Sequence, residues 1–157
     1  MLNLVGEFEC NLDSKGRFLF PAGLIRQMPA DAPLQFVVNR GFEPCLVLYS
    51  SAEWKKISDE INQLNMYVKK NREFIRYFYR GASELAADAN KRLLLPKPLL
   101  GYASISKEIV LCAFSRWIEI WDRKRYYSLL NDEPEDFAVR AEDVMSKKEA
   151  KGDGLIS

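Results

Sequence analysis

The chain has 157 residues, of which 48% are hydrophobic and 29% charged, and its formal net charge is +1. This composition predicts a folded protein of one ordinary domain or two very small ones. The sequence has no histidine, which excludes a Ser-His-Asp catalytic site and removes the commonest metal ligand. Cys10, Cys45 and Cys112 lack metal-ligand spacing, so we expect three small core residues, no metal and no cofactor.

No apolar run approaches the roughly 20 residues that span a bilayer. The first residues, Met1 to Glu7, lack the basic start of a secretory signal. We therefore expect a cytoplasmic protein with no membrane partner, and no small-molecule substrate is evident.

Charge is distributed unevenly along the chain. Residues 69–80 carry five basic side chains and one acidic one, whereas residues 132–157 carry eight acidic and four basic ones. An acidic tail therefore masks a basic body, and this asymmetry is more informative than the net charge.

The sequence repeats itself at a shift of 75 residues. Charged, glycine, proline and apolar positions recur in order, and the matched pairs are Gly6 and Gly81, Glu9 and Glu84, Asp13 and Asp88, Arg17 and Arg92, Pro21 and Pro96, and Leu24 and Leu99. If three residues are removed near Asn39 to Pro44, the match resumes at an offset of 72. We expect a first copy over residues 5–64 and a second over residues 81–131.

The first copy begins with a strand of alternating polar and apolar residues up to Leu12. Residues 13–16 predict a turn, followed by a strand at 17–20 and a short helix opened by Pro21. Strands follow at 34–39 and 45–49. Ser50 and Glu53 have capping-box spacing, which predicts that a longer helix starts there.

A linking helix is expected over residues 65–80. In the second copy, we expect strands near 82–87 and 92–95, a short helix after Pro96, and strands near 108–114 and 117–121. Asp122 is a suitable N-cap for the next helix. The acidic tail, residues 132–157, is expected to be weakly packed, with a loose helix from 136 to 148.

A single copy is too small to bury a sizeable core alone, whereas two copies can share one. If each copy lends its hairpin to the other, the strands close into one barrel with pseudo-twofold symmetry. The predicted fold is thus a β-rich α+β protein with a double-split, swapped-hairpin β-barrel and flanking helices. Such symmetry suits a twofold ligand, and duplex DNA is the obvious one.

The D-x-x-x-R element followed by apolar residues and proline occurs twice, as Asp13 with Arg17 and as Asp88 with Arg92. This pattern resembles the MraZ family, of the AbrB/MazE-type swapped-hairpin superfamily, over about residues 1–131. The segments 45–49 and 76–82 are also similar to the family. The second copy departs from the pattern, because Lys91 stands where the first has Gly16. We expect Asn90 to take the left-handed backbone conformation there.

The resemblance implies a cytoplasmic, nucleoid-associated transcription regulator that binds short repeated sites upstream of its own operon. In this family that operon heads a cluster of cell-wall and cell-division genes. The resemblance also implies a homo-oligomer, assembled as a ring. The expected partners are therefore double-stranded DNA and further copies of the chain.

The expected DNA-binding residues lie at the two turns. The arginines Arg17 and Arg92 can donate two hydrogen bonds at once to a phosphate or a guanine edge. Asp13 and Asp88 would orient them or merely hold the turns. Lys15 and Lys91 flank the turns, where they are either phosphate contacts or ordinary solvated charges.

A second group of basic residues follows a helical spacing and consists of Lys69, Arg72, Arg76 and Arg80. It is a phosphate-tracking face, a subunit contact or simply a solvated face. Phe74, Tyr77 and Phe78 are expected to pack inward. We also expect that a small barrel cannot bury Trp54, Trp117, Trp121 and the aromatic residues of 67–79 together, which favours assembly beyond a dimer.

Three alternatives remain open at this stage. An antitoxin-like module would bind DNA and a toxin partner through the tail. An enzyme is disfavoured, because the sequence has no phosphate-binding glycine loop, no metal cluster and no nucleophile–base pair. A purely structural ring would bind no operator DNA.

Overall fold

The computed structural model describes residues 2–131 and 137–156, with side chains described as far as residue 147. The chain forms two compact units, Met1–Tyr126 and Tyr127–Ser157. Part of the predicted tail, residues 132–136 and 157, lies outside the described residues. Among the helices that are described, none is both long and apolar enough to cross a membrane.

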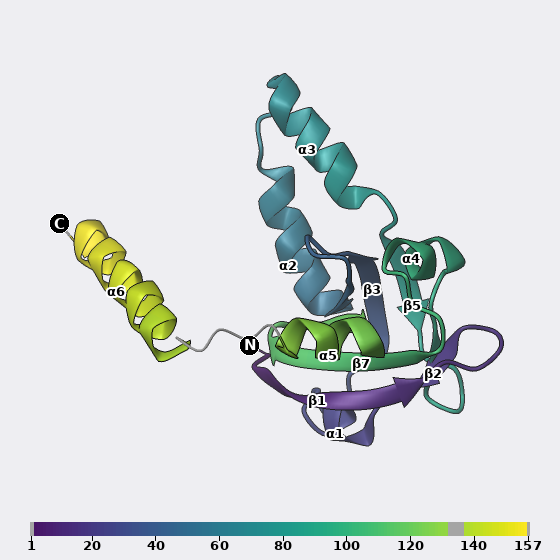
Figure 1. Cartoon of the computed structure of the whole chain (residues 1–157). Helices are drawn as coiled ribbons and strands as arrows, with labels where there is room; N and C mark the ends of the chain where they lie inside the picture. The colour runs from purple at the N-terminus through teal and green to yellow at the C-terminus, as the bar shows by residue number, and fades with distance from the viewer. Residues whose placement is uncertain (1, 132–136, 157) are drawn as a thin grey trace. The chain divides into compact units, whose positions relative to one another are not determined.

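The elements follow the predicted order along the chain (Figure 1). The first copy comprises β1 (Leu4–Asn11), β2 (Arg17–Leu19), α1 (Ala22–Ile25), β3 (Gln35–Arg40), β4 (Leu46–Ser50) and α2 (Ser51–Asn62), and α3 (Lys69–Tyr79) follows. The second copy comprises β5 (Ser83–Ala86), β6 (Arg92–Leu94), α4 (Lys97–Tyr102), β7 (Glu108–Ser115), β8 (Trp117–Asp122) and α5 (Arg123–Asn131). The last helix, α6 (Phe137–Ile156), extends beyond the predicted range of 136–148.

Helix starts are fixed by the residues that the sequence indicates. The hydroxyl oxygen of Ser50 accepts a 3.2 Å hydrogen bond from the backbone N–H of Glu53, and a carboxylate oxygen of Asp122 accepts one of 3.3 Å from that of Arg125. Pro21 and Pro96 occupy the N-cap positions of α1 and α4. The side chains of Ser50 and Asp122 thus accept hydrogen bonds from backbone N–H groups that have no partner within the helix. Pro21 and Pro96 have no backbone N–H that would need one.

The strands form a six-stranded antiparallel sheet of order β1-β7-β8-β4-β3-β5 and a separate two-stranded sheet of β2 and β6. Exchanging each strand with its counterpart in the other copy (β1 with β5, β2 with β6, β3 with β7, β4 with β8) reproduces the same order read backwards. The register obeys the same exchange: Arg17 faces Leu94, and Leu19 faces Arg92. The strand topology therefore has a pseudo-twofold axis, which passes near the Phe18–Leu93 pair.

The predicted closed barrel is wrong. The two arms of each hairpin separate immediately after the turn: the backbone N–H of Asp13 bonds the carbonyl of Arg17, but β1 then pairs with β7 and β2 with β6. The six-stranded sheet consequently ends at β1 and β5, and among the described strands no ladder joins it to the β2–β6 ribbon. The two arms of each hairpin thus lie in different sheets, and neither sheet closes on itself.

The three-residue difference between the copies also lies elsewhere than predicted. The ladders match β3 to β7 at an offset of 73, since Val38 pairs with Leu48 as Leu111 pairs with Ile120. Two of the three residues are therefore missing from the loop before β7, and only one from the turn before β8. Loops absorb such length changes because they lie on the surface.

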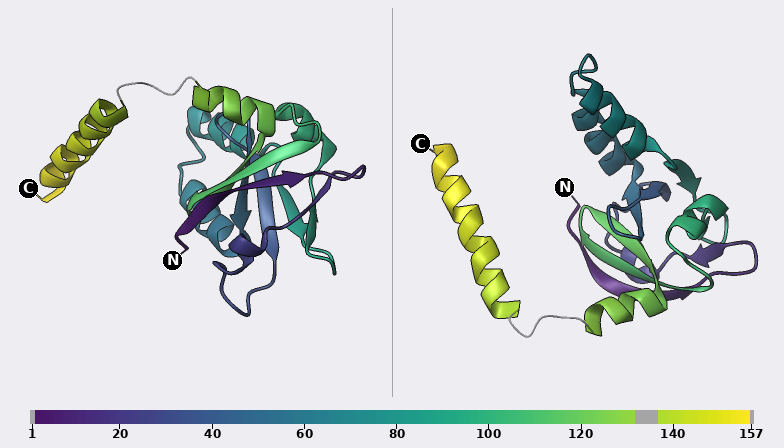
Figure 2. Two further views of the ribbon diagram at one scale, coloured as in Figure 1. Left: turned by 60° about the horizontal axis from the view of Figure 1, so that its bottom comes forward. Right: turned by 45° about the horizontal axis from the view of Figure 1, so that its top comes forward.

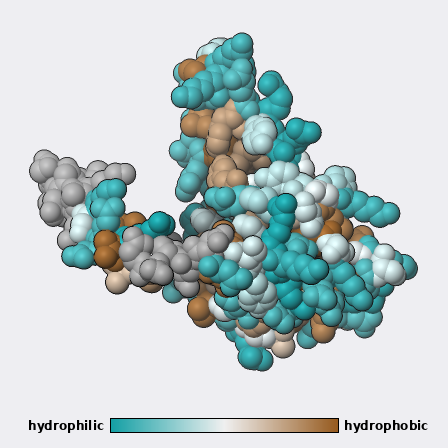
Figure 3. Space-filling model, viewed as in Figure 1, coloured by the Kyte–Doolittle hydropathy of each residue, from teal (hydrophilic) through white to brown (hydrophobic). Residues whose placement is uncertain are grey.

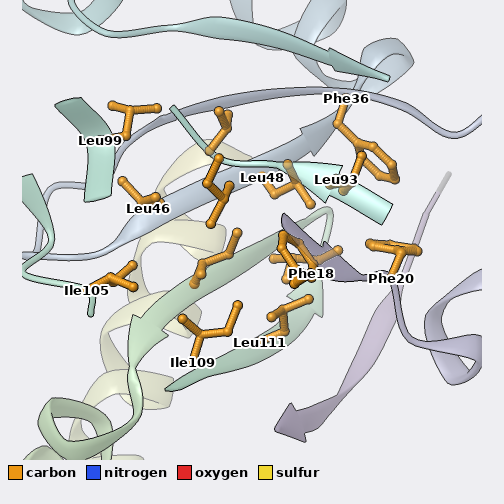
Figure 4. Close-up of a cluster of buried hydrophobic side chains, with 14 of the residues drawn as sticks. Phe18, Phe20, Phe36, Leu46, Leu48, Leu93, Leu99, Ile105, Ile109 and Leu111 are labelled. Atoms are coloured by element: carbon orange, nitrogen blue, oxygen red, sulfur yellow. The ribbon is translucent and has the colours of Figure 1, made fainter. Parts of the chain in front are cut away.

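The core lies between the ribbon and the main sheet, since its buried residues come from both. Phe18 and Leu93, the inward-facing residues of β2 and β6, are 1% and 0% exposed. Figure 4 shows both side chains within the cluster that also contains Phe36, Leu48 and Leu111. The residues of both copies thus share one core, as the small size of each copy requires.

Helices α2 and α3 form an arm that projects from the sheet (Figures 1 and 2). The ring of Trp54 on α2 stacks on that of Phe78 on α3, with 5.8 Å between ring centroids. The base of the arm is tied to β3: the side-chain amide of Asn39 donates to the carbonyl of Phe78 at 2.7 Å, and Arg40 donates to those of Tyr77 and Arg80 at 3.0 Å each. These bonds satisfy carbonyls at the end of α3.

Some aromatic residues are not where the sequence predicts. Phe74 and Tyr77 are 43% and 64% exposed, whereas both were expected to pack inward. Trp121 is buried in a small second cluster with Cys45, Val110 and Cys112, whereas Trp54 and Trp117 are only partly buried, so the aromatic residues are not all buried together, as expected. Residues at the tip of the arm remain exposed, with Tyr67 at 93%. Figure 3 shows hydrophobic surface along this arm.

We predict that removing the side chains at the pseudo-twofold axis destabilises the whole fold. Phe18→Ala should lower the free energy of unfolding by about 3–5 kcal/mol and Leu93→Ala by about 2–5 kcal/mol, because each leaves a cavity in the shared core. Urea denaturation followed by circular dichroism measures both. Leu19→Ala and Leu94→Ala are the matched controls, since these neighbours face outward, and should change stability by no more than about 0.5 kcal/mol. Equal effects on both pairs would contradict the observed burial.

Candidate nucleic-acid interface

The first turn, between β1 and β2, is organised by Asp13. One carboxylate oxygen accepts hydrogen bonds of 2.9 Å from the backbone N–H groups of Lys15 and Arg17. The other accepts a bond of 2.8 Å from the side-chain Nε of Arg17. Gly16 closes the turn at a positive φ of 87°. The aspartate thus shapes the loop and fixes the direction of the arginine at the same time.

The second turn, between β5 and β6, repeats this geometry. Asp88 accepts hydrogen bonds of 2.9 Å each from the backbone N–H groups of Asn90 and Arg92 and from the Nε of Arg92. The left-handed residue is Lys91, with φ of 61°, and not Asn90 as predicted. The second turn has the same backbone conformation as the first. Lys91, at the position of Gly16, therefore adopts a positive φ that is unfavourable for a residue with a Cβ.

Both aspartates remain ionised at neutral pH. The backbone N–H of Arg17 is the main reason that the pKa of Asp13 falls to about 2, and the Arg17 guanidinium also lowers it. The pKa of Asp88 is lowered in the same way by Arg92. A carboxyl whose pKa is lower in the folded than in the unfolded state stabilises the fold at higher pH. This contribution is therefore complete above about pH 4 and is lost as the pH falls towards 2.

The arginines keep most of their hydrogen-bonding capacity for another partner. Each uses Nε for its aspartate, and among the described residues the terminal nitrogens of Arg17 and Arg92 have no hydrogen-bond acceptor. Both side chains are partly exposed, at 27% and 32%. Two fixed guanidinium groups, related by the pseudo-twofold axis, are thus presented on one face of the ribbon.

The same face carries two leucines that the sequence analysis missed. Because side chains alternate along a strand, Phe18 and Leu93 point inward and Leu19 and Leu94 point outward with the arginines. Leu19 and Leu94 are 62% and 51% exposed. The runs Phe18–Phe20 and Leu93–Leu95 are apolar throughout, which conceals the alternation, although the period of two was available as a signal.

The remaining predicted residues fall into two places. Lys15 and Lys91 are exposed at the turns, beside the arginines. Lys69, Arg72 and Arg76 lie along α3 on the arm and Arg80 directly follows it, and in the described part of the chain none shares a hydrogen bond or ion pair with either turn. The basic groups therefore form two separate surfaces.

We predict that Lys91→Gly stabilises the protein by about 0.5–1 kcal/mol, because glycine adopts a positive φ without steric cost. The reciprocal change, Gly16→Lys, should be destabilising, since Gly16 has a φ of 87°, at which a residue with a Cβ is strained. Thermal unfolding of both variants measures the effect. Asn90→Gly is the control and should give no stabilisation. A gain with Asn90→Gly instead would contradict the assignment of the strained residue.

Comparison with known proteins is in agreement with the repeated pattern. The family model described as "MraZ protein, putative antitoxin-like" matches residues 4–77 and again residues 78–147. A "Transcriptional regulator MraZ" from Christiangramia forsetii is 42% identical over 153 residues, which cover 97% of this chain and 99% of that protein. Proteins of the same description from Flavobacterium psychrophilum and Cytophaga hutchinsonii are 44% and 38% identical, covering 92% of this chain and 93% and 97% of theirs. The chain therefore belongs to the MraZ family.

Proposed function

We propose that this protein is a DNA-binding transcription regulator and that it acts on the promoter of its own cell-wall and cell-division gene cluster. We propose that it is not an enzyme and that it acts in the cytoplasm, bound to the nucleoid. The described relatives carry the name of a transcriptional regulator, which supports the general function. The operon and its short repeated sites follow from the family resemblance.

One observation carries the proposal: the two Asp–Arg pairs present equivalent guanidinium groups about a pseudo-twofold axis, at Nε to carboxylate distances of 2.8 and 2.9 Å. Duplex DNA has local twofold symmetry, so one ribbon can make the same contact with each strand. An antiparallel two-stranded ribbon also fits the width of the major groove.

The contacting groups have distinct roles. Arg17 and Arg92 donate their terminal N–H groups to guanine edges or phosphates, while Asp13 and Asp88 position them. Lys15 and Lys91 contact phosphates, which sets register and affinity without reading sequence. Lys69, Arg72, Arg76 and Arg80 contribute a second phosphate-tracking or subunit-contacting face on the arm.

We further propose that the units of the chain are a first copy over 5–64, a linking segment over 65–80, a second copy over 81–131 and a tail over 132–157. The strands exchanged between the copies make the swapped-hairpin superfamily the natural assignment. The chain assembles into a closed ring, because unequal copies favour head-to-tail contacts and exposed apolar side chains such as Tyr67 are typical of interfaces.

We predict that Arg17→Ala and Arg92→Ala each weaken binding to DNA from upstream of the gene by about 1–3 kcal/mol, the value of one bidentate base contact. Gel shifts at fixed salt, with operator and scrambled duplexes side by side, measure the loss. A loss confined to the operator indicates base contacts, and a uniform loss indicates phosphate contacts.

Arg140→Ala is a control that removes one positive charge from the tail and should leave affinity nearly unchanged. Each arginine variant must also unfold at the same urea concentration as the wild type. Wild-type affinity in both arginine variants would exclude the ribbon as the DNA-binding face.

We predict that the protein forms an assembly larger than a dimer. Light scattering behind a sizing column should give a mass above twice 18.1 kDa at micromolar concentration. Several phased sites on one duplex should then be bound more tightly than a single site, because the second contact is intramolecular. A monomeric mass, or equal affinity for one site and for several, would contradict the assembly.

A further inference from the structure

The outward face of the β2–β6 ribbon has a composition that ordinary solvation does not explain. It consists of two arginines and two leucines, arranged so that each arginine lies directly opposite a leucine: Arg17 faces Leu94, and Leu19 faces Arg92. The leucines are more exposed than the arginines, at 62% and 51%. A solvated two-stranded ribbon would normally carry polar residues on this face.

We infer that Leu19 and Leu94 are specificity-determining residues that pack against thymine methyl groups in the major groove. The inference rests on the proposed function, because it assigns a role to a second pair of side chains on the same ribbon. The thymine methyl is the only apolar group that a base presents in the major groove, and apolar side chains are its usual partners.

The register makes the two kinds of contact simultaneous. Side chains directly opposite each other on a ribbon lie about 5 Å apart at Cβ, so a ribbon that brings Arg17 to a base edge also brings Leu94 to a neighbouring base. The pseudo-twofold axis then places Arg92 and Leu19 in the same relation to the other half of the site. Each half of the site is thus read as one polar and one apolar contact.

Charge complementarity identifies DNA as the occupant of this face. The exposed leucines are flanked by Arg17, Arg92, Lys15 and Lys91, and the two aspartates nearby are already engaged by the arginines. One further carboxylate, Glu84, lines a hollow beside Leu94, but Lys15 and Lys97 line it too, so the surface keeps an excess of positive charge. Such a surface attracts a polyanion and would repel a basic partner. A subunit contact through the same leucines is the competing explanation and is an outcome of the test.

The experiment replaces thymine by deoxyuridine, which removes only the methyl group. Binding of the full-length wild type to the operator duplex is measured by fluorescence anisotropy with each thymine replaced in turn. We expect about a fourfold loss for each contacted methyl, the effect of re-exposing one buried carbon. In the Leu19→Ala/Leu94→Ala variant, the thymine and deoxyuridine duplexes should bind with the same affinity.

Phe42→Ala is the matched control, because it removes an apolar side chain that is 90% exposed in the β3–β4 turn. It should retain the full deoxyuridine penalty. A penalty that persists in the double leucine variant overturns the inference, as does a wild type that binds its operator with no response to deoxyuridine. Loss of oligomer mass in that variant, with the penalty unchanged, would assign the leucines to a subunit contact. If the wild type does not distinguish operator from scrambled DNA, the proposed function fails as well.

Discussion

The antiparallel pairing of β2 with β6 is the contact on which the rest of the structure depends. It joins strands from different copies, and the Phe18–Leu93 pair at its centre is buried completely in the shared core. Neither copy could bury these residues alone, because its own hairpin arms separate after the turn. Burial therefore forces the exchange, and the exchange fixes where the two turns lie relative to each other.

This constraint also explains why two different turn sequences have one geometry. Asp13 and Asp88 each accept two backbone N–H groups and one arginine Nε, and this hydrogen-bond pattern requires a left-handed residue before the arginine. Glycine meets the requirement in the first copy, and Lys91 meets it at a φ of 61° in the second. A residue held in a costly conformation persists when its surroundings determine it, and here the ribbon and the aspartate do so.

Much of this arrangement could be predicted from the sequence, since the repeat, the order of the elements along the chain and both Asp–Arg turns are patterns of spacing and residue type. The closed barrel was wrong, because periodicity does not encode whether the outer strands of the two sheets pair with each other. Lys91 was missed because propensity favours Asn in the left-handed region, whereas position in the turn decided the outcome. The outward leucines were missed because three consecutive apolar residues look like continuous core. The capping of α3 by Asn39 and Arg40 links residues almost 40 positions apart and has no sequence signal.

The departures from symmetry lie at the edges of the main sheet, away from the ribbon, and this bears on the two kinds of partner that we propose. The register of the ribbon and the hydrogen bonds of its two turns obey the twofold exchange, although Lys91 stands in place of Gly16. The two copies differ where the arm leads into the second copy. In the first copy, β1 has eight residues, and the side-chain amide of Gln27 bonds the backbone N–H and the carbonyl of Val5 at its edge. Its counterpart β5 has four residues, and the carbonyl of Arg80, the residue matching Val5, is instead bonded by Arg40. A symmetric face suits a twofold duplex, whereas a head-to-tail assembly requires unequal faces. The ribbon thus keeps the twofold arrangement that suits the proposed duplex, and the edges of the main sheet carry the inequality that the proposed assembly would need.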